Sequence, residues 1–287
     1  MGTSNPSRPA TGAPVADTLA AGLAAAGLDW IVPAWPAPPD VGALATTRAG
    51  GIGAGPAATM DLGVAALATG GTSAATVQNR RRLTAFLPSP PVWLDQVHGT
   101  AVAVLDAATV AAARAAPPVA DAAVTSERGI VCAVRTADCL PVLFANRRGG
   151  AVGVAHGGWR GLAGGVLEAT VSALAALGAR PGDLVAWFGP AIGPNAFEVG
   201  SDVRDAFSAR DPGATQCFAP LRQGKWHADL YRLARRRLAA AGVHDVHGGD
   251  FCTFSDATRF HSYRRERAAG RMATLVWLAP NGGGRKL

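Results

Sequence analysis

The sequence has no long uninterrupted hydrophobic run and is poor in charged and aromatic residues. No stretch approaches ~20 apolar residues without glycine, proline or charge, which excludes a membrane-spanning helix. Hydrophobic residues nevertheless make up 49% of the 287 residues, whereas only 16% are charged. A disordered chain would be poorer in apolar residues and richer in charge. The length therefore allows a full hydrophobic core, in one large domain or two small ones.

Cysteine is also scarce, and its spacing excludes the common paired motifs. No CxxC pair occurs among the four cysteines, which are Cys132, Cys139, Cys217 and Cys252. The apolar stretch 19–28 is mostly alanine and glycine and follows Asp17, so it does not resemble a secretory signal peptide. We therefore predict a cytoplasmic protein with reduced thiols. In that compartment, unpaired cysteines belong to a core, a metal site or a catalytic site more often than to a disulfide.

Lysine is nearly absent although the chain is basic. The balance of 27 Lys and Arg against 20 Asp and Glu gives a net charge of +7, and Lys225 and Lys286 are the two lysines. This arginine excess fits either a polyanion-binding face or a coding bias toward arginine, alanine and glycine. The runs Arg80–Arg82 and Arg235–Arg237 fall in helix-like stretches, which favours solvated helix faces. We therefore predict no nucleic-acid partner, and the oligomeric state stays open.

The ends of the chain differ in composition from its middle. Residues 1–28 are rich in proline, alanine, glycine and serine, and we predict a flexible tail with at most one weak helix. Residues 281–287 are predicted to form a second flexible tail. Because no repeat or linker interrupts the chain between these ends, residues 29–280 are predicted to form one catalytic domain.

Apolar runs and helical patterns alternate along this domain. The pattern predicts helices over 162–177 and 229–241, the second with Asp229 as its N-cap. Adjacent runs such as 130–134 and 141–145 resemble a hairpin, which favours a mixed sheet. The predicted class is therefore α/β (α+β), a single domain of mixed β-sheets flanked by helices. Strands are predicted for the apolar runs 92–94, 102–105, 130–134, 141–145, 151–155, 184–188 and 272–278.

Three metal-binding side chains lie where apolar runs end. His98 follows one run, Cys139 lies in the turn between two runs, and His156 ends a run directly before a helical pattern. Two imidazoles and one thiolate are a sound zinc set, with the fourth position open for water or substrate. The same ligand types also suit copper. Their spacing carries no signature, and by spacing alone a buried thiol with two hydrogen-bonded histidines is the more common explanation of such residues.

A Cys-His hydrolase is a second interpretation of the same residues. Cys139 would be the nucleophile, His98 or His156 its base, and Asp138 or Asp95 the residue that orients the base. A zinc-bound thiolate is a poor free nucleophile. The metal and hydrolase interpretations therefore exclude each other in any one state.

Several arginines lie in segments suited to anions. Glycines 157 and 158 precede a helical pattern and leave backbone N–H groups free, and Arg160 adds a planar donor pair for phosphate or carboxylate. The segment 260–271 gathers further arginines, Arg264 among them, around aromatic residues. A tight connection or an ion-paired loop explains these patterns as well as a ligand does.

Ten segments in this order resemble the YfiH family, also called the laccase-domain or peptidoglycan editing factor family. They span residues 46–273, so the resemblance covers most of the chain. The matching segments are Thr46–Gly51, Asn79–Arg80, Gln96–Gly99, Ala137–Val142, His156–Gly161, Gly189–Pro194, Phe197–Gly200, Cys252–Thr253, Ser262–Arg265 and Gly270–Ala273.

The resemblance implies a zinc site built from His98, Cys139 and His156 in a cytoplasmic purine nucleoside enzyme. Family members split adenosine, inosine, guanosine or methylthioadenosine with phosphate, some deaminate adenosine, and the laccase label stems from polyphenol oxidation. We therefore expect purine nucleosides and phosphate as substrates and Zn²⁺ as cofactor, in preference to Cu²⁺. Catalytic roles fall to the three ligands and Arg160, and substrate contacts are predicted for Arg48, Gln96, Asp138 and Arg264.

Two further function classes stay open. One is a Cys-His amide hydrolase acting on peptidoglycan precursors, and the other is a non-catalytic metal-bound protein with a partner role. A laccase-like polyphenol oxidase is improbable, because a multicopper cluster needs many more imidazoles than this chain has. Beyond the two histidines of the triad, the chain carries His227, His244, His247 and His261.

Overall fold

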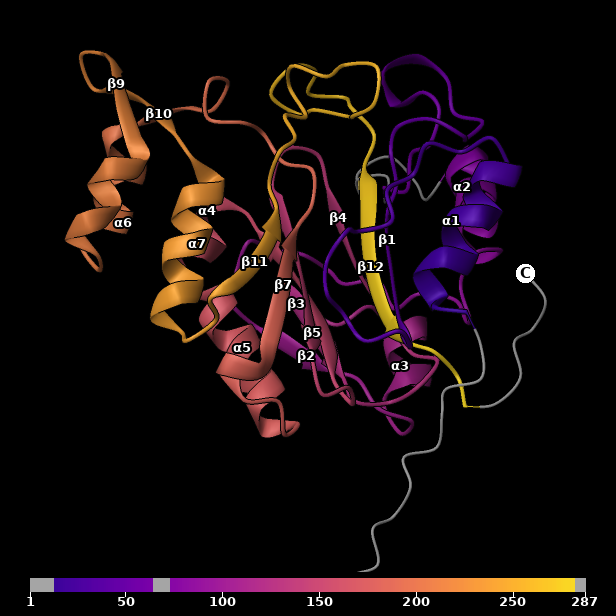
Figure 1. The fold of residues 1–287 in the computed structure, drawn as a ribbon. Coiled ribbons are helices and arrows are strands. Elements are labelled where there is room, and N and C mark those ends of the chain that lie inside the picture. Colours follow the sequence, from indigo (N-terminus) through magenta and orange to yellow (C-terminus); the bar gives the residue numbers. More distant parts are fainter. Residues whose placement is uncertain (1–12, 64–72, 282–287) are drawn as a thin grey trace, which may run out of the picture.

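The strands of the protein form three sheets in a computed structural model that describes residues 13–63 and 73–281 (Figure 1). A six-stranded mixed sheet has the order β11-β7-β5-β6-β3-β2, and two antiparallel sheets have the orders β1-β12-β4 and β8-β10-β9. The strands are β1 (Val41–Ala45), β2 (Val102–Val104), β3 (Ala122–Thr125), β4 (Val131–Thr136), β5 (Leu140–Asn146), β6 (Val152–Gly157), β7 (Leu184–Phe188), β8 (Glu198–Gly200), β9 (Phe218–Arg222), β10 (Lys225–Ala228), β11 (Asp245–Gly248) and β12 (Met272–Leu278). The predicted α/β class, with mixed sheets flanked by helices, is confirmed.

Helices cover the outer faces of the six-stranded sheet and of the sheet β1-β12-β4 (Figure 1). Helices α5 and α7 pack on the six-stranded sheet, whose other face packs against β1-β12-β4, and α1 and α2 cover that second sheet from outside. No helix in residues 13–63 and 73–281 is both long and apolar enough to cross a membrane. The helices are α1 (Val15–Ala25), α2 (Ala74–Thr84), α3 (Val110–Ala115), α4 (Trp159–Gly164), α5 (Val166–Ala176), α6 (Ser201–Ser208) and α7 (Leu230–Ala240), with 3₁₀ turns at Gly55–Ala57, Pro181–Asp183 and Pro212–Cys217.

Six of the seven predicted strands are present, but the predicted hairpin is wrong. Strand β4 pairs with β12, whereas β5 pairs with β6 and β7 in the other sheet. Both segments are buried on two faces and are therefore apolar along their length. Their sequence pattern for this reason does not indicate which strand each one pairs with. The seventh run contributes only an isolated bridge between Val92 and Cys132.

The two predicted helices are present with one difference. Asp229 caps α7 by accepting a hydrogen bond from the backbone N–H of Arg232 at 2.9 Å, as predicted. The pattern over 162–177 is divided between α4 and α5 by Gly165, whose φ of 107° lies in the left-handed region. Glycine adopts this conformation without the steric cost that a side chain would bring.

The segment predicted as an N-terminal tail contains one helix, which the prediction allowed. Residues 15–25 form α1, and Leu19 and Leu23 are buried in the cluster around Leu44. Burial of this leucine stripe holds the helix on the sheet. The rest of the predicted tail, residues 1–12, and residues 282–287 lie outside the described residues.

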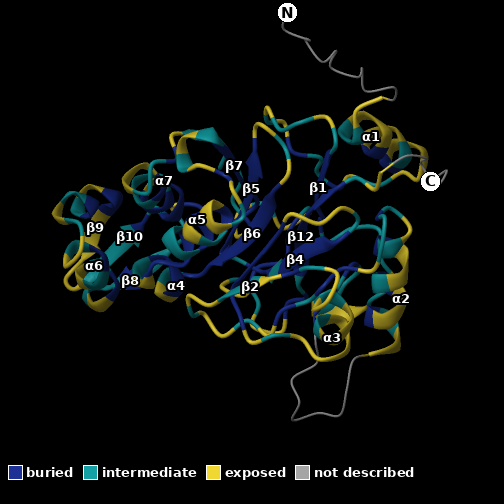
Figure 2. Cartoon of the chain, turned by 90° about the horizontal axis from the view of Figure 1, so that it is seen from below, coloured by how far each residue is buried: buried dark blue, intermediate teal, exposed yellow. Residues whose placement is uncertain are grey.

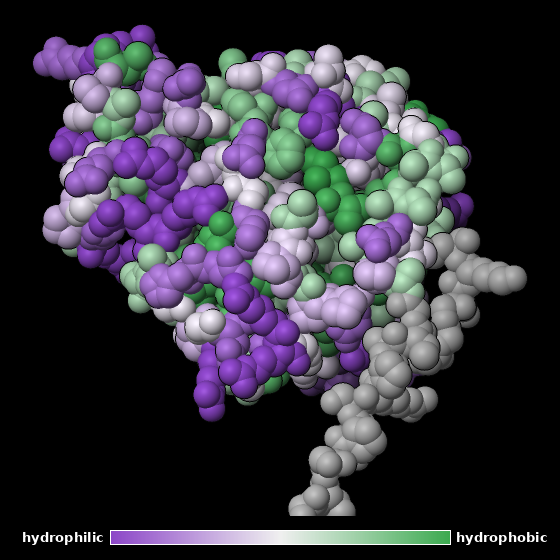
Figure 3. Space-filling view, viewed as in Figure 1, coloured by the Kyte–Doolittle hydropathy of each residue, from purple (hydrophilic) through white to green (hydrophobic). Residues whose placement is uncertain are grey.

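Burial follows the layers. Figure 2 shows buried strands at the centre and exposed residues on the outward faces of the helices. Hydrophilic residues gather over the side formed by α5, α6 and α7 (Figure 3). The arginine run of α7 is not simply solvated, since Arg236 pairs with Asp211 and Arg237 pairs with Glu168. These arginines bind parts of the protein to one another.

Candidate metal centre

Two neighbouring strands and one loop bring the three candidate ligands together. Cys139 directly precedes β5, His156 lies in β6 opposite Pro141, and His98 lies in the loop between Val92 and β2. Their ligand atoms all lie within 4.8 Å of one another, and the Cys139 sulfur is 3.7 Å from Nε2 of His98. The convergence predicted from the sequence is therefore present.

The loop that carries His98 is held in a costly backbone conformation. His98 has a φ of 62°, which is uncommon for a residue with a side chain. The carboxylate of Asp121 accepts hydrogen bonds from the backbone N–H groups of Val97, His98 and Gly99 at 3.2, 2.9 and 2.6 Å. These three bonds offset the strain and aim the imidazole of His98 at Cys139 and His156.

Asp121 also orients the second imidazole. Its carboxylate lies 2.8 Å from Nδ1 of His156, and the backbone N–H of His156 donates to the backbone carbonyl of Asp121 at 2.7 Å. Both residues are buried. A carboxylate on one ring nitrogen fixes the other nitrogen, Nε2, as the ligand atom. One buried carboxylate thus positions both histidines.

The charges of the site reinforce one another. Burial opposes ionisation of Cys139, but the charge and hydrogen bonds of His156 and His98 outweigh it and lower the pKa of the thiol to about 6. Burial likewise opposes a charge on His156, but the Cys139 thiolate and Asp121 raise its pKa to about 9. The thiolate is the form that binds a metal or acts as a nucleophile.

Gly158 leaves the space that His98 occupies. A Cβ atom at this position would lie 2.6 Å from Cδ2 of His98 and 3.4 Å from the Cys139 sulfur. Gly158 is also the residue that precedes α4. A side chain here would therefore push His98 out of the triad.

The donor set fits a single divalent cation. Ligands on a tetrahedral Zn²⁺ with bonds of ~2.0–2.3 Å lie roughly 3.5 Å apart, close to the 3.7 Å between Cys139 and His98. Two nitrogens and a sulfur leave one corner of the tetrahedron for substrate or water. In the parts of the chain that the structure describes, no other group of three such side chains gathers.

The family to which the chain is related agrees with this centre. Residues 42–279 match the family described as multi-copper polyphenol oxidoreductase laccase. The chain belongs to this laccase-domain family. The YfiH resemblance seen in the sequence is thereby confirmed.

Laccase-domain relatives resemble the chain over most of their length. It is 51% identical to a purine nucleoside phosphorylase of Pseudomonas aeruginosa over 251 residues, which cover 87% of this chain and 98% of that protein. It is 49% identical to the purine nucleoside phosphorylase YfiH of Escherichia coli, with 86% and 98% covered. The crystal structure of a Neisseria meningitidis protein superposes with a TM-score of 0.80 at 44% identity, covering 88% of this chain and all of that one.

The structure places the predicted substrate-binding residues in different settings. The Gln96 amide donates to the backbone carbonyl of Arg135 and accepts from its N–H, each at 2.9 Å. The Arg48 guanidinium donates to two backbone carbonyls, and Arg264 donates to the carbonyl of Glu198. Arg160 is exposed, with its guanidinium carbon 4.5 Å from the centroid of the Trp159 ring. Of these side chains, that of Arg160 keeps most of its donors available to a ligand.

The carboxylate of Asp138 bonds to a neighbouring segment of the chain. It does not contact a ligand imidazole; its carboxylate accepts from the hydroxyls of Thr253 and Ser262 and from the backbone N–H of Arg264. These bonds hold Asp138 at a φ of 93°, directly before Cys139. Asp138 therefore ties the segment 253–264 to the turn of the thiol.

The carboxylate that orients an imidazole is Asp121, which the sequence analysis missed. Asp121 is fully buried at the start of β3. In the sequence, Asp121 could have been noticed as a single acidic residue directly before the apolar run 122–124. A buried carboxylate needs partners, and here two histidines and a loop backbone supply them.

Proposed function

We propose that this chain is a purine nucleoside phosphorylase whose catalytic cation, Zn²⁺, is held by His98, Cys139 and His156. The observation that carries the proposal is the convergence of these three ligand atoms within 4.8 Å of one another. Relatives about 50% identical over nearly their whole length bear the name purine nucleoside phosphorylase, which supports the reaction class. The expected cytoplasmic location is part of the same proposal.

Phosphorolysis joins a phosphate oxygen to the anomeric carbon of the ribose and breaks the bond to the purine nitrogen. The bound cation supplies Lewis acidity that orients or polarises the nucleoside. Arg160, which is exposed and follows His156 by four residues, offers a planar donor pair suited to an anion. Asp121 keeps Nε2 of His156 and the ring of His98 aimed at the place that the cation would occupy, so the substrate would meet a prearranged site.

The nitrogen and sulfur donors suit copper as well as zinc, but a multicopper centre needs more ligands. The four remaining histidines join no second group of three in residues 13–63 and 73–281. We therefore assign Zn²⁺ and set polyphenol oxidation aside. We also propose that the same centre deaminates adenosine, since a zinc site can activate water as well.

One observation favours a second candidate, a Cys-His amide hydrolase acting on peptidoglycan precursors. Cys139, His156 and Asp121 form a chain in which the thiol pKa is lowered to about 6 and the imidazole is oriented by a carboxylate. This is the arrangement of a cysteine nucleophile with its base. It would act in the metal-free protein, whereas phosphorolysis requires the metal-loaded one.

Incubation of the purified chain with adenosine, with and without phosphate, separates the candidates. We expect phosphate-dependent release of adenine by the Zn²⁺-loaded protein. His98→Ala should lose both bound metal and adenine release, whereas His244→Ala, which changes an exposed histidine, should keep both. Full activity of His98→Ala would reject the metal role, and cleavage of a muropeptide amide by metal-free protein would favour the hydrolase.

A further inference from the structure

Three arginines from separate parts of the chain converge beside the metal centre. Arg80 lies in α2, Arg135 in β4, and Arg271 directly before β12. The guanidinium carbons of Arg80 and Arg135 lie 5.1 and 5.8 Å from the centroid of the Trp93 ring. Arg271 is close enough to Arg135 for the two charges to repel each other. Like charges gathered in this way need a compensating anion.

The protein itself supplies little compensation. Among the described residues, none of the three guanidinium groups has a carboxylate within ion-pair distance, although nine ion pairs occur elsewhere. The residues outside the described ranges contain no aspartate or glutamate. Asp61 and Asp95 act on the Arg135 charge from farther away. Three positive charges against these two negative ones leave the cluster with a net positive charge.

Donors in the cluster also lack acceptors. Nε of Arg80 and Nε of Arg135 are buried and have no hydrogen-bond partner. Their NH2 groups donate to backbone carbonyls, of Leu62 and Gly63 for Arg80 and of Leu94 for Arg135. These bonds fix each guanidinium group while its Nε stays unpaired. Buried donors without partners are rare in folded proteins.

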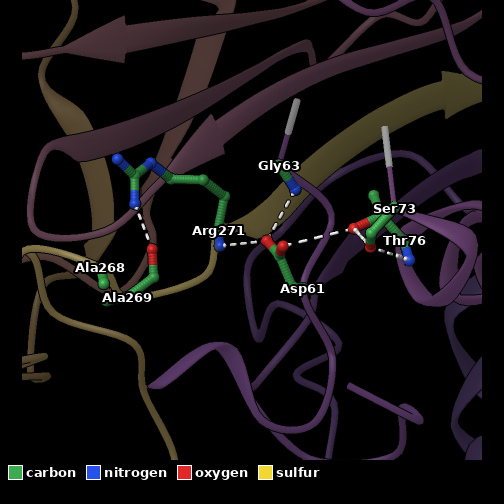
Figure 4. A pocket seen from close by; sticks show the side chains of 7 residues that line it. All are labelled: Asp61, Gly63, Ser73, Thr76, Ala268, Ala269 and Arg271. Carbon is green, nitrogen blue, oxygen red and sulfur yellow. Dashed lines mark hydrogen bonds between the residues drawn. The ribbon is translucent and has the colours of Figure 1, made fainter. Parts of the chain in front are cut away.

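A cleft of about 240 Å³ is lined by one member of the cluster, Arg271 (Figure 4). Arg271, Thr76 and Asp61 line it, and Arg80 follows Thr76 by one helical turn on the same face of α2. The Asp61 carboxylate is turned toward its own partners, since it accepts from the backbone N–H groups of Gly63 and Arg271 and from the Thr76 hydroxyl. The guanidinium group of Arg271 points away from Asp61 in Figure 4.

Two members of the cluster lie near the segment that carries Cys139. Met272 pairs with Thr136, so Arg271 lies beside Ala137, two residues from Cys139. Arg135 precedes Cys139 by four residues, which limits their Cα separation to roughly 14 Å. Arg135 and Arg271 are therefore close to the segment of the thiol along the backbone.

We propose that Arg80, Arg135 and Arg271 form a phosphate-binding subsite next to the metal centre. Guanidinium groups recognise phosphate through paired charge-assisted hydrogen bonds. Arg271 lines the cleft, and Arg80 and Arg135 add to the positive charge around Arg271. The phosphate group is either inorganic phosphate, the co-substrate of the proposed function, or the phosphate of a purine nucleotide. The subsite thus deepens the proposed function without depending on turnover.

Direct binding tests the subsite. Equilibrium dialysis of the Zn²⁺-loaded chain with radiolabelled inorganic phosphate, and calorimetry with adenosine 5′-monophosphate, compare Arg80→Gln and Arg271→Gln with the unmodified chain. We expect at least tenfold weaker binding of one or both probes. Arg82→Gln is the matched control, because Arg82 lies on the same helix and is exposed. Arg160→Ala is measured alongside, so that phosphate bound at that residue is recognised.

Each outcome decides the proposal. Loss confined to inorganic phosphate identifies the co-substrate, and loss confined to the nucleotide identifies a phosphorylated ligand. Unchanged binding of both probes in the two variants overturns the subsite. Circular dichroism verifies folding, and Arg271→Lys, which keeps the charge but not the planar donor pair, should give intermediate affinity. A chain that binds phosphate through these arginines but does not split adenosine refutes the proposed function alone.

Discussion

Two buried histidines of this protein behave in opposite ways. His156 and His261 are 3% and 0% exposed. The pKa of His156 is raised to about 9, because the Cys139 thiolate and Asp121 overcome its burial. Burial, with the nearby charge of Arg48, lowers the pKa of His261 to about 4. Burial alone therefore says nothing about the charge of a histidine, and the neighbouring groups decide it.

The surroundings of the two rings explain the difference. Nδ1 of His156 pairs with a carboxylate, whereas neither ring nitrogen of His261 has a hydrogen-bond partner. Gly270 packs against His261 so closely that a Cβ atom there would lie 2.8 Å from its Nε2. His261 is thus a neutral packing residue, and His156 is a ligand prepared to carry charge.

The largest expected effect concerns His261 and acid stability. The unfolded chain takes up a proton at this residue near pH 6.5, whereas the folded chain does so only near pH 4. The free energy of unfolding therefore falls as the pH decreases from 6.5 to 4, by about 3 kcal/mol. His261→Leu should remove this loss and cost little at pH 7, since an apolar side chain leaves no buried group unpaired.

Urea unfolding of the metal-free protein at pH 7 and pH 4 measures this difference. The metal is removed because its release in acid would also change stability. His244→Ala, at an exposed histidine, should retain the acid sensitivity of the unmodified chain. An equal loss of stability in His261→Leu and the unmodified chain would show that His261 has a partner for its proton.

The second-largest expected effect concerns Asp121, the carboxylate partner that His156 has and His261 lacks. Asp121→Asn keeps the size of the side chain but removes the charge that orients both histidines. Loss of such a partner typically weakens metal binding about 10- to 100-fold. Competition with a chelator measures the affinity for Zn²⁺. Asp106→Asn is the control, because Asp106 also accepts backbone hydrogen bonds, from Ala108 and Thr109, but contacts none of the ligands. Equal affinity in both variants would contradict the role of Asp121.

The same comparison shows what the sequence can and cannot predict. Strands such as β7 and β12 were predicted nearly to the residue, because short buried apolar runs are a local property. The ligands were found because His98, Cys139 and His156 each follow or end such a run. Their convergence is not local, and it was inferred from a resemblance and not from spacing.

Other features depend on which strands become neighbours. The pairing of β4 with β12 joins residues more than 130 positions apart, and no local pattern encodes it. Asp121 was missed for the same reason, since its partners at 97–99 and 156 come from other parts of the chain. The arginine cluster likewise draws on three separate elements, so its charge pattern was visible only as an overall excess of arginine.

The smallest expected effect concerns the pH at which the Cys139 thiol ionises. In metal-free protein, the imidazolium of His156 should keep Cys139 ionised down to a pH of about 6, whereas a free cysteine ionises near 8.5. A low-pKa thiolate is also a weaker nucleophile, so we expect only a roughly threefold gain in alkylation rate at pH 7. The midpoint of the pH profile is therefore the decisive quantity. Peptide-resolved mass spectrometry after iodoacetamide treatment measures it, with Cys217, whose pKa is raised by burial, as the internal reference.

Asp121→Asn should move the midpoint of Cys139 upward, because the carboxylate no longer supports the charge on His156. A midpoint that stays near 6 in that variant would assign the stabilisation of the thiolate to His98 instead, and the contrast between the two buried histidines would then not depend on Asp121.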